Sequence, residues 1–431
     1  MKKNKIAVQI QNYTLSTRQQ KLIDAGISGF FNFGLSSDED IQQHVFYSSW
    51  DSCHLLFKIA AVKLVQWEQK QREAHKETNP KRAIRPKADL LVVFIILFFQ
   101  KMQGYSLVNM LQHHLRFDLL LRSAIFSHLG EQVDFPKRTT LMKYQELFSK
   151  DGVIEDIFMT HTDILQGKAA FYLNNASNEY EDISGGEVGA IDASFFEVNR
   201  YKKSQNKTAG SKKDSDKSQE KSAGINKASE RQIDPDAKWT IKRNCAYHGY
   251  KGTFIIDVAS GMITVVTLVS ANCHDITQLK NACKKLPSSM RNIKKLLADS
   301  GYASKKIQSE LLQEHNVNLV HSKRPYKNKP LTQLDIEHNH QVSHLRITIE
   351  HTFAHIKNDQ KFRIRTKRKI KATGELLMAV IAHNVLRMQG IIDGRVHKVR
   401  TKSAIDAAQT HKSRHLNLRQ PCRLGNFQRY Q

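Results

Sequence analysis

The spacing of apolar residues divides the chain into a front part and a rear part. Up to residue 150, apolar side chains recur every three or four positions, as they do along one face of an α-helix. This pattern predicts helices over 54–75, 89–103, 107–115 and 139–148. We interpret residues 1–150 as an all-helical N-terminal domain, which could bind DNA or serve only for packing.

From residue 185 onwards, β-branched and aromatic residues become frequent, which is typical of strands. We expect strands over 187–199, 293–299 and 317–320, and a hairpin over 252–270 that turns at Ser260-Gly261. Helices are expected over 276–286, 304–315, 344–358 and 375–389. The alternation predicts an α/β domain over residues 151–393, with a mixed β-sheet flanked by helices.

Two segments carry few large apolar side chains. Residues 202–234 are crowded with Lys, Ser, Asp and Gln, and residues 394–431 are basic without apolar periodicity. Neither can bury enough apolar surface to offset the entropy lost on folding. We therefore predict a disordered insertion in the α/β domain and a loose basic tail.

The charge balance favours a polyanionic partner. Lysine and arginine outnumber aspartate and glutamate by 67 to 41, which gives a formal net charge of +26. Cationic side chains release counterions when they bind a phosphate backbone, and nucleic acid is the commonest soluble polyanion. The alternative is a basic protein without such a partner.

Cysteine usage and hydropathy indicate an intracellular protein with no membrane partner. The five cysteines are scattered without a CxxC pair, so they indicate neither a disulfide framework nor a zinc site. Residues 6–13 are too polar and too few for the core of a signal peptide. The longest apolar run, 90–99, falls short of the roughly 20 residues that span a bilayer.

Two aspartates stand in segments predicted as strands. Asp192 lies inside the first strand, where aspartate is uncommon, and Asp299 closes the strand at 293–299. A carboxylate inside a strand has to be hydrogen-bonded, paired or metal-bound, and ligands gather beyond the carboxyl ends of strands in open α/β sheets. Taken singly, Asp192 could be satisfied by backbone amides and Asp299 could cap a helix.

A third acidic residue, Glu350, lies between Arg346 and Lys357 on the helix predicted over 344–358. At about 100° per residue, the three side chains share a stripe beside the apolar face. The competing interpretation is a solvated face with an ordinary ion pair between Arg346 and Glu350.

Together, Asp192, Asp299 and Glu350 suit metal-dependent chemistry on phosphates, and we predict them as catalytic and metal-binding residues. Mg²⁺ and Mn²⁺ prefer hard oxygen ligands and complete their shells with water and phosphate oxygens. Two such ions can activate a water or a 3′-hydroxyl and stabilise the leaving oxygen. Arg346 and Lys357 would then bind phosphate oxygens.

A dense basic cluster follows between residues 361 and 371. The order Arg363-Ile364-Arg365 predicts a short extended segment with one basic face, suited to DNA, although a solvated basic loop has the same composition. Asp275, after His274, could lie near a metal or cap the following helix. The predicted DNA-binding residues are Arg346, Lys357, Lys251, Arg363, Arg365, Lys367 and Arg368.

These motifs are similar to those of a known family. Arg346, Glu350 and Lys357 resemble the Y-R-E-K signature of bacterial insertion-sequence transposases of the DDE class, in the insertion sequence four/five superfamily. The segments around Asp192 (Gly-Ala-Ile-Asp-Ala-Ser) and Asp299 (Leu-Ala-Asp-Ser-Gly-Tyr) resemble the two aspartate motifs of that family. The resemblance covers roughly residues 85–390.

The resemblance implies an RNase-H-like catalytic domain that binds two Mg²⁺ or Mn²⁺ ions through the three carboxylates. It also implies cutting and joining of double-stranded DNA at terminal inverted repeats, by a homodimer in the bacterial cytoplasm. The N-terminal domain would bind DNA ends or dimerise. The signature tyrosine falls at Ser343, and another group, such as Tyr326 or His344, could supply its phosphate contact.

Two other functions fit the same residues. One is a metal-dependent nuclease of this fold without strand transfer, and the other is a sequence-specific DNA-binding protein, such as a degenerate transposase.

Overall fold

The structure of this protein, a computed structural model, describes residues 13–34, 51–78, 88–102, 136–175, 186–198, 234–242, 245–286, 293–326 and 330–392. The helix expected over 107–115, the basic tail and the expected insertion, apart from Asp234, lie outside these residues.

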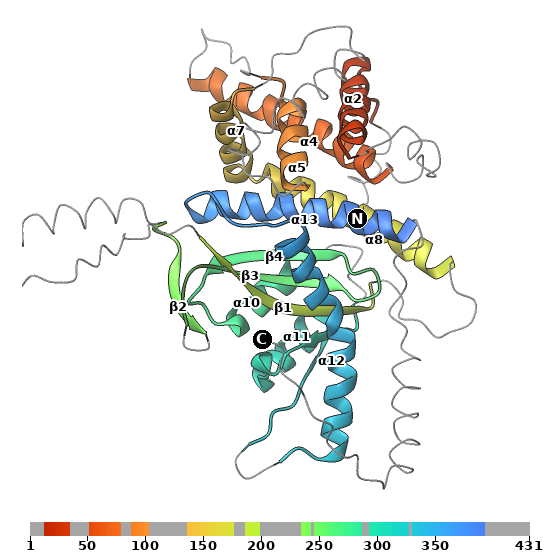
Figure 1. Cartoon of the computed structure of the whole chain (residues 1–431), viewed down its shortest axis with the longest axis vertical. Helices are drawn as coiled ribbons and strands as arrows, with labels where there is room; N and C mark the ends of the chain where they lie inside the picture. The colour runs from red at the N-terminus through yellow and green to blue at the C-terminus, as the bar shows by residue number, and fades with distance from the viewer. Residues whose placement is uncertain are drawn as a thin grey trace, which may run out of the picture.

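Helices from the front part of the chain lie above the sheet in Figure 1. Three of them confirm predicted helices, and α5 begins directly after Asp89, whose carboxylate accepts hydrogen bonds from the amides of Leu91 at 3.0 Å and Val92 at 3.4 Å. The first and last were not predicted. The helices are α2 (Thr17–Gly34), α4 (Asp51–Thr78), α5 (Leu90–Met102), α7 (Arg138–Lys150) and α8 (Val153–Asn175).

The rear part contains one mixed sheet, as the alternation of strands and helices predicted. Along the sheet the strands follow the order β2-β3-β1-β5-β6, and β4 pairs with β3. β3 is antiparallel to β1, β2 and β4, whereas β5 is parallel to β1 and β6. The strands are β1 (Val188–Glu197), β2 (Lys238–Lys242), β3 (Cys245–Asp257), β4 (Ile263–Ser270), β5 (Lys295–Ala298) and β6 (Asn318–His321).

Helices cover both faces of this sheet. One face contributes Ile191 and Ile255 to a smaller core with α10 (Asp275–Lys284) and α11 (Lys305–His315). The other face joins a larger core that extends into the helices of the front part. Alternate residues of β1 therefore enter different cores, as a strand in the middle of a sheet requires.

The C-terminal helix α13 (Lys369–Ile392) lies between the front helices and the sheet (Figure 1). It packs on α5, α7 and α8 on one side and on β4 on the other. The residues assigned to separate domains thus share one core in the structure. By length and composition α13 could also cross a membrane, but 78% of its apolar window is buried inside the protein, as in a core helix.

The helix that carries Arg346 and Glu350 is longer than predicted. It runs as α12 over Gln333–Ala354 and continues as a π-helical turn over His355–Asp359, closed by the bond from the Gln360 amide to the His355 carbonyl at 2.9 Å. The prediction of one regular α-helix over 344–358 was therefore wrong at its end. π-Helical turns of this kind are frequent at functional sites.

Candidate functional site

The pairing of β1 with β5 brings Asp192 and Asp299 together. Val188, Gly189 and Ala190 pair in parallel with Lys295, Leu296 and Leu297. Continued by two residues, this register sets Asp192 beside Asp299, whose backbone is still extended (φ −74°, ψ 164°). Neighbouring strands lie about 4.8 Å apart, and partner positions in parallel strands share a face. Two aspartates that are 107 positions apart in sequence thus meet at one edge of the sheet.

Asp192 has one cationic partner and two acidic neighbours. Its carboxylate accepts a hydrogen bond from Arg346 Nη2 at 3.0 Å and another from the Ala193 amide at 2.7 Å. Burial raises the pKa of Asp192, Arg346 and the Ala193 amide lower it, and the charges of Asp299 and Asp275 raise it again, with a net increase. Burial is therefore the main cause of the raised pKa of Asp192, and the two acidic neighbours add to it.

Asp275 supplies the third carboxylate of this region. It begins α10, and its side chain forms an ion pair with Lys251 Nζ at 2.9 Å. Lys251 also donates a hydrogen bond to the carbonyl of Cys273 at 2.8 Å. The candidate DNA-binding lysine Lys251 is thus held at the edge of the acidic cluster, which we define as Asp192, Asp275 and Asp299.

A buried tyrosine adjoins the acidic cluster. Tyr302 ends the short 3₁₀ turn that follows Asp299, and only 1% of its surface is exposed. Its hydroxyl has no hydrogen-bond partner among the described residues. Burial and then the charges of Asp275, Asp192 and Asp299 raise the pKa of Tyr302, so its hydroxyl is protonated at neutral pH. Sequence reasoning included Tyr302 only as the last residue of the Asp299 motif and gave it no role, because the sequence does not show what surrounds its side chain.

Glu350 lies on the same helix as Arg346, one turn further on, and is exposed. Among the ion pairs of the described residues, Arg346 pairs with Asp192 and not with Glu350, which removes the interpretation of an ordinary i, i+4 pair. Within the described residues, no group of three or more His, Cys, Asp or Glu side chains is arranged to hold a metal. The role of Glu350 as third metal ligand therefore stays a prediction.

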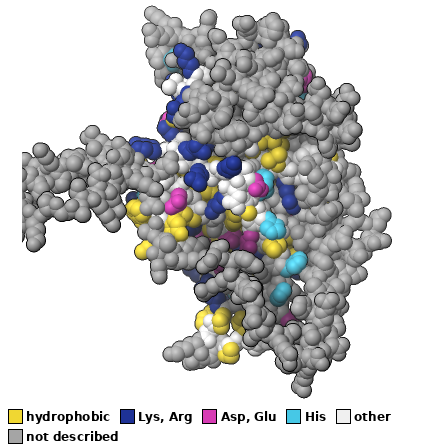
Figure 2. All heavy atoms as spheres, viewed as in Figure 1, with side chains coloured by type: hydrophobic (Ala, Val, Ile, Leu, Met, Phe, Trp, Pro, Cys, Tyr) yellow, Lys and Arg dark blue, Asp and Glu magenta, His cyan; other side chains and the backbone are white. Residues whose placement is uncertain are grey.

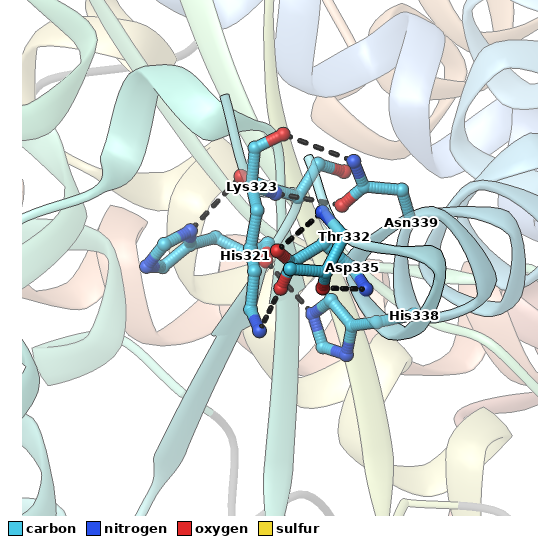
Figure 3. A network of polar contacts seen from close by, with 7 residues as sticks. His321, Lys323, Thr332, Asp335, His338 and Asn339 are labelled. Carbon is cyan, nitrogen blue, oxygen red and sulfur yellow. Dashed lines mark hydrogen bonds and ion pairs between the residues drawn. The ribbon is translucent and has the colours of Figure 1, made fainter. Parts of the chain in front are cut away.

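The start of α12 is tied to the end of β6 by the polar network in Figure 3. Asn339 accepts from the Lys323 amide at 2.7 Å and donates to the Lys323 carbonyl at 2.9 Å. His338 contacts the carbonyl of His321 at 3.1 Å, and Asp335 forms an ion pair with Lys323 at 2.6 Å. Because β6 pairs with β5, this network fixes the helix of Arg346 relative to the strand that leads to Asp299.

The basic segment, residues 361–368, is extended around Ile364, as the order Arg363-Ile364-Arg365 predicted, whereas residues 366–368 bend. Phe362 and Ile364 are buried while Lys361, Arg363 and Arg365 are exposed, and Ile364 forms a parallel bridge with Val198 of the β1 end. Lys367 and Arg368 are exposed as well. One face of the segment is therefore basic, whereas contact of this face with DNA stays a prediction.

A buried carboxylate holds the basic segment in place. Glu375 of α13 accepts hydrogen bonds from the amides of Arg365 at 2.8 Å and Thr366 at 3.1 Å, and from the Thr366 hydroxyl at 3.1 Å. Its other oxygen pairs with Lys101 of α5 at 2.8 Å. Sequence reasoning missed this pair, since its members are 274 positions apart.

Basic side chains gather on the face shown in Figure 2, around a few acidic ones. Lys357 belongs to the π-helical turn and places its ammonium 5.1 Å from the centre of the Phe196 ring on β1. The predicted cations thus come from elements that surround the sheet edge, and not from one helix stripe.

A comparison with known families finds a match within the rear part of the chain. Residues 183–385 match the family described as the transposase DDE domain. The match begins before β1 and ends within α13, so it includes Asp192, Asp299 and Glu350.

Among solved structures, the chain is similar to a piggyBac transposase synaptic complex with hairpin DNA, at 11% identity over 85% of this chain and 82% of that chain, with a TM-score of 0.39. A Mos1 strand transfer complex (10% identity, 89% and 98% coverage) and a pre-cleavage Mos1 transpososome (9% identity, 88% and 99% coverage) each have a TM-score of 0.19. TM-scores of this size carry no argument about the fold or activity of this chain.

Proposed function

We propose that this protein is an insertion-sequence transposase that cuts DNA at terminal inverted repeats and joins the ends to a target. We place it in the insertion sequence four/five superfamily and in the bacterial cytoplasm. The observation that carries the proposal is the meeting of Asp192 and Asp299 at one sheet edge, inside a segment that matches the transposase DDE domain.

We assign the sheet to the RNase-H-like class. Three strands, β4, β3 and β1, form an antiparallel meander, and β5 and β6 continue it in parallel with β1. The two aspartates then lie on the first strand and directly after the first parallel strand that follows, where ligands of open α/β sheets gather.

The residues present fit a divalent cation. Asp192 and Asp299 offer neighbouring hard oxygen ligands. Burial is the largest cause that raises the pKa of Asp192, and the charge of Asp299 adds a smaller repulsion, which a cation would relieve. Mg²⁺ is often held by one or two carboxylates together with water and phosphate oxygens. When bound, Mg²⁺ or Mn²⁺ would polarise the phosphate and the attacking oxygen. We propose that two such ions bind and that Glu350 is a further ligand.

The chain's own cations would hold the DNA. Arg346 pairs with Asp192 through Nη2, while its buried Nε has no hydrogen-bond partner among the described residues. This donor suits a phosphate oxygen. Arg363 and Arg365 on the exposed face of the basic segment would bind the flanking backbone, and a homodimer would bring two ends together.

The test uses a plasmid that carries the coding sequence with its flanking DNA. The purified chain with Mg²⁺ should cut at the element ends and join a labelled 3′-hydroxyl end to target DNA. Asp192→Asn should lower the cleavage rate by more than about 100-fold, because the loss of a residue that only hydrogen-bonds a metal ligand already costs about 10–100-fold. Asp156→Asn is the control, because it changes an exposed carboxylate on α8.

Cleavage by Asp192→Asn at the wild-type rate would contradict the proposal. The exposure of Glu350 favours a second candidate, a degenerate transposase that only binds DNA. If the wild-type chain binds the element ends but leaves them uncut, the result supports a degenerate transposase. If it cuts the DNA without joining the ends, the result supports a nuclease.

A further inference from the structure

Tyr302 combines complete burial with an unused hydroxyl. Its ring belongs to the smaller core, together with Ile191 and Leu279, and this packing fixes the direction of the side chain. The backbone adds to this, because the Tyr302 amide donates to the Asp299 carbonyl at 3.1 Å. A buried hydroxyl is nearly always hydrogen-bonded in a folded protein, so one without a partner calls for a physical explanation.

The surroundings of the hydroxyl show what kind of partner fits. Tyr302 follows Asp299 by three residues, and the 3₁₀ turn that it ends packs on α10, which begins at Asp275. In agreement with this position, the charges of Asp275, Asp192 and Asp299 raise the pKa of Tyr302 further, after burial. None of the three carboxylates accepts a hydrogen bond from it in this structure. The hydroxyl therefore adjoins the acidic cluster as a fixed donor.

An anionic oxygen entering alone would be repelled by three carboxylates. An oxygen that is bound to a divalent cation would be accepted, because the cation offsets the negative charge. The Tyr302 hydroxyl would therefore find its hydrogen-bond acceptor in an oxygen ligand of a cation, either a water molecule or a phosphate oxygen of DNA.

We propose that the Tyr302 hydroxyl donates a hydrogen bond to an oxygen ligand of the divalent cation held by Asp192 and Asp299. This inference rests on the proposed function. It gives Tyr302 the contact that the sequence left to Tyr326 or His344: Tyr326 is 71% exposed and His344 is exposed.

The test compares the full-length wild-type chain with Tyr302→Phe, which removes the hydroxyl and keeps the ring. Tyr326→Phe is the matched control, because it removes an exposed hydroxyl. The unfolding temperature in EDTA should be unchanged or higher in Tyr302→Phe, since the variant loses an unsatisfied polar group. A marked fall in EDTA would mean that the hydroxyl serves the fold, and would overturn the inference.

Mn²⁺ binding, followed by the paramagnetic resonance signal of the unbound ion, tests the contact without DNA. If the partner is a metal-bound water, Tyr302→Phe should weaken Mn²⁺ binding by about 10-fold, which is the lower end of the effect of losing a residue that hydrogen-bonds a metal ligand. If the partner is a phosphate oxygen, Mn²⁺ binding should stay unchanged while DNA cleavage falls by about 10-fold. Both results support the inference and identify the oxygen.

If Tyr302→Phe binds Mn²⁺ and cuts DNA like the wild-type chain while Asp192→Asn is impaired in both, the inference about Tyr302 is wrong and the proposed function is unaffected. If Asp192→Asn binds Mn²⁺ and cuts DNA like the wild-type chain, the proposed function itself falls. The two failures are therefore distinguishable.

Discussion

Two carboxylates in this protein are each paired with a cation in a largely buried place, yet their pKa values shift in opposite directions. Glu375 pairs with Lys101 between α13 and α5, where 4% and 6% of the side chains are exposed. Asp192 pairs with Arg346 at the sheet edge, where 26% and 11% are exposed. Burial alone would raise the pKa of both carboxylates.

The difference lies in the other neighbours. At Glu375, burial is outweighed by the Lys101 ammonium and the amides of Arg365 and Thr366, so the pKa is lowered. At Asp192, Arg346 and one amide do not outweigh burial and the two acidic neighbours, so the pKa is raised. The first pair is electrostatically complete and holds structure together. The second pair has two further carboxylates, Asp299 and Asp275, as neighbours, and a cation would lessen the repulsion among them.

The largest effect is expected from removing the cation of the complete pair. Lys101→Met would leave the charge of Glu375 buried without its partner, and it should lower the free energy of unfolding by about 3–5 kcal/mol. Urea denaturation measures this loss. Lys63→Met is the control, because its partner Asp156 is 65% exposed and can be solvated, so the loss should be smaller. Equal losses in both variants would contradict the comparison.

The pH dependence of stability should separate the two carboxylates. Because the pKa of Glu375 is lowered from its usual value of 4.5, its contribution is present above pH 4.5 and is lost as pH falls through the lowered pKa. For Asp192 the sign is reversed: its raised pKa makes the folded protein less stable as pH rises from 3.8 through the raised value.

Unfolding of the wild-type chain in urea between pH 3 and 7 tests these signs. The double variant Lys101→Met/Glu375→Gln lacks the first titration and should lose less stability below about pH 4.5. Asp192→Asn lacks the second and should lose less stability as pH rises in EDTA. A double variant that follows the wild-type curve in acid would show that Glu375 is not electrostatically complete.

The smallest effect is expected from relieving the repulsion at the sheet edge. Asp299→Asn removes one negative neighbour of Asp192, while the amide oxygen can still accept from the Gly301 amide. In EDTA the variant should gain up to about 1 kcal/mol, the scale of a partly exposed charge pair. Thermal unfolding with and without Mn²⁺ measures this gain. Mn²⁺ should stabilise the wild-type chain more than the variant. If the variant is less stable than the wild-type chain in EDTA, repulsion between Asp299 and Asp192 does not lower the stability of the fold.

Much of the fold was predictable because its elements carry strong local patterns. Both helices around Leu90 and Tyr144 and every strand except β2 were predicted from spacing and residue type. The missing part had no such signal: the first half of α12 is polar, and it is held by the capping box of Thr332 and Asp335 and by contacts to Lys323. A helix stabilised by distant polar partners leaves no apolar periodicity to read.

The candidate site was predictable in its residue types and less so in its geometry. Asp192 and Asp299 stood out because aspartate is uncommon in strands, and the structure brings them together. The stripe of Arg346, Glu350 and Lys357 assumed a regular helix, and the π-helical turn at Lys357 breaks that regularity. Tyr302 could have been suspected from its place two residues after Ser300, but its burial depends on α10, which sequence spacing does not place.

The position of α13 has a consequence for protein synthesis. This helix ends the described part of the chain, yet it packs on α5, α7 and α8, which are synthesised much earlier. During translation the front helices emerge long before α13 is synthesised. Their apolar faces therefore stay exposed until the chain has been made up to residue 392. Prematurely terminated chains would thus lack a finished core, and we expect proteases to degrade them.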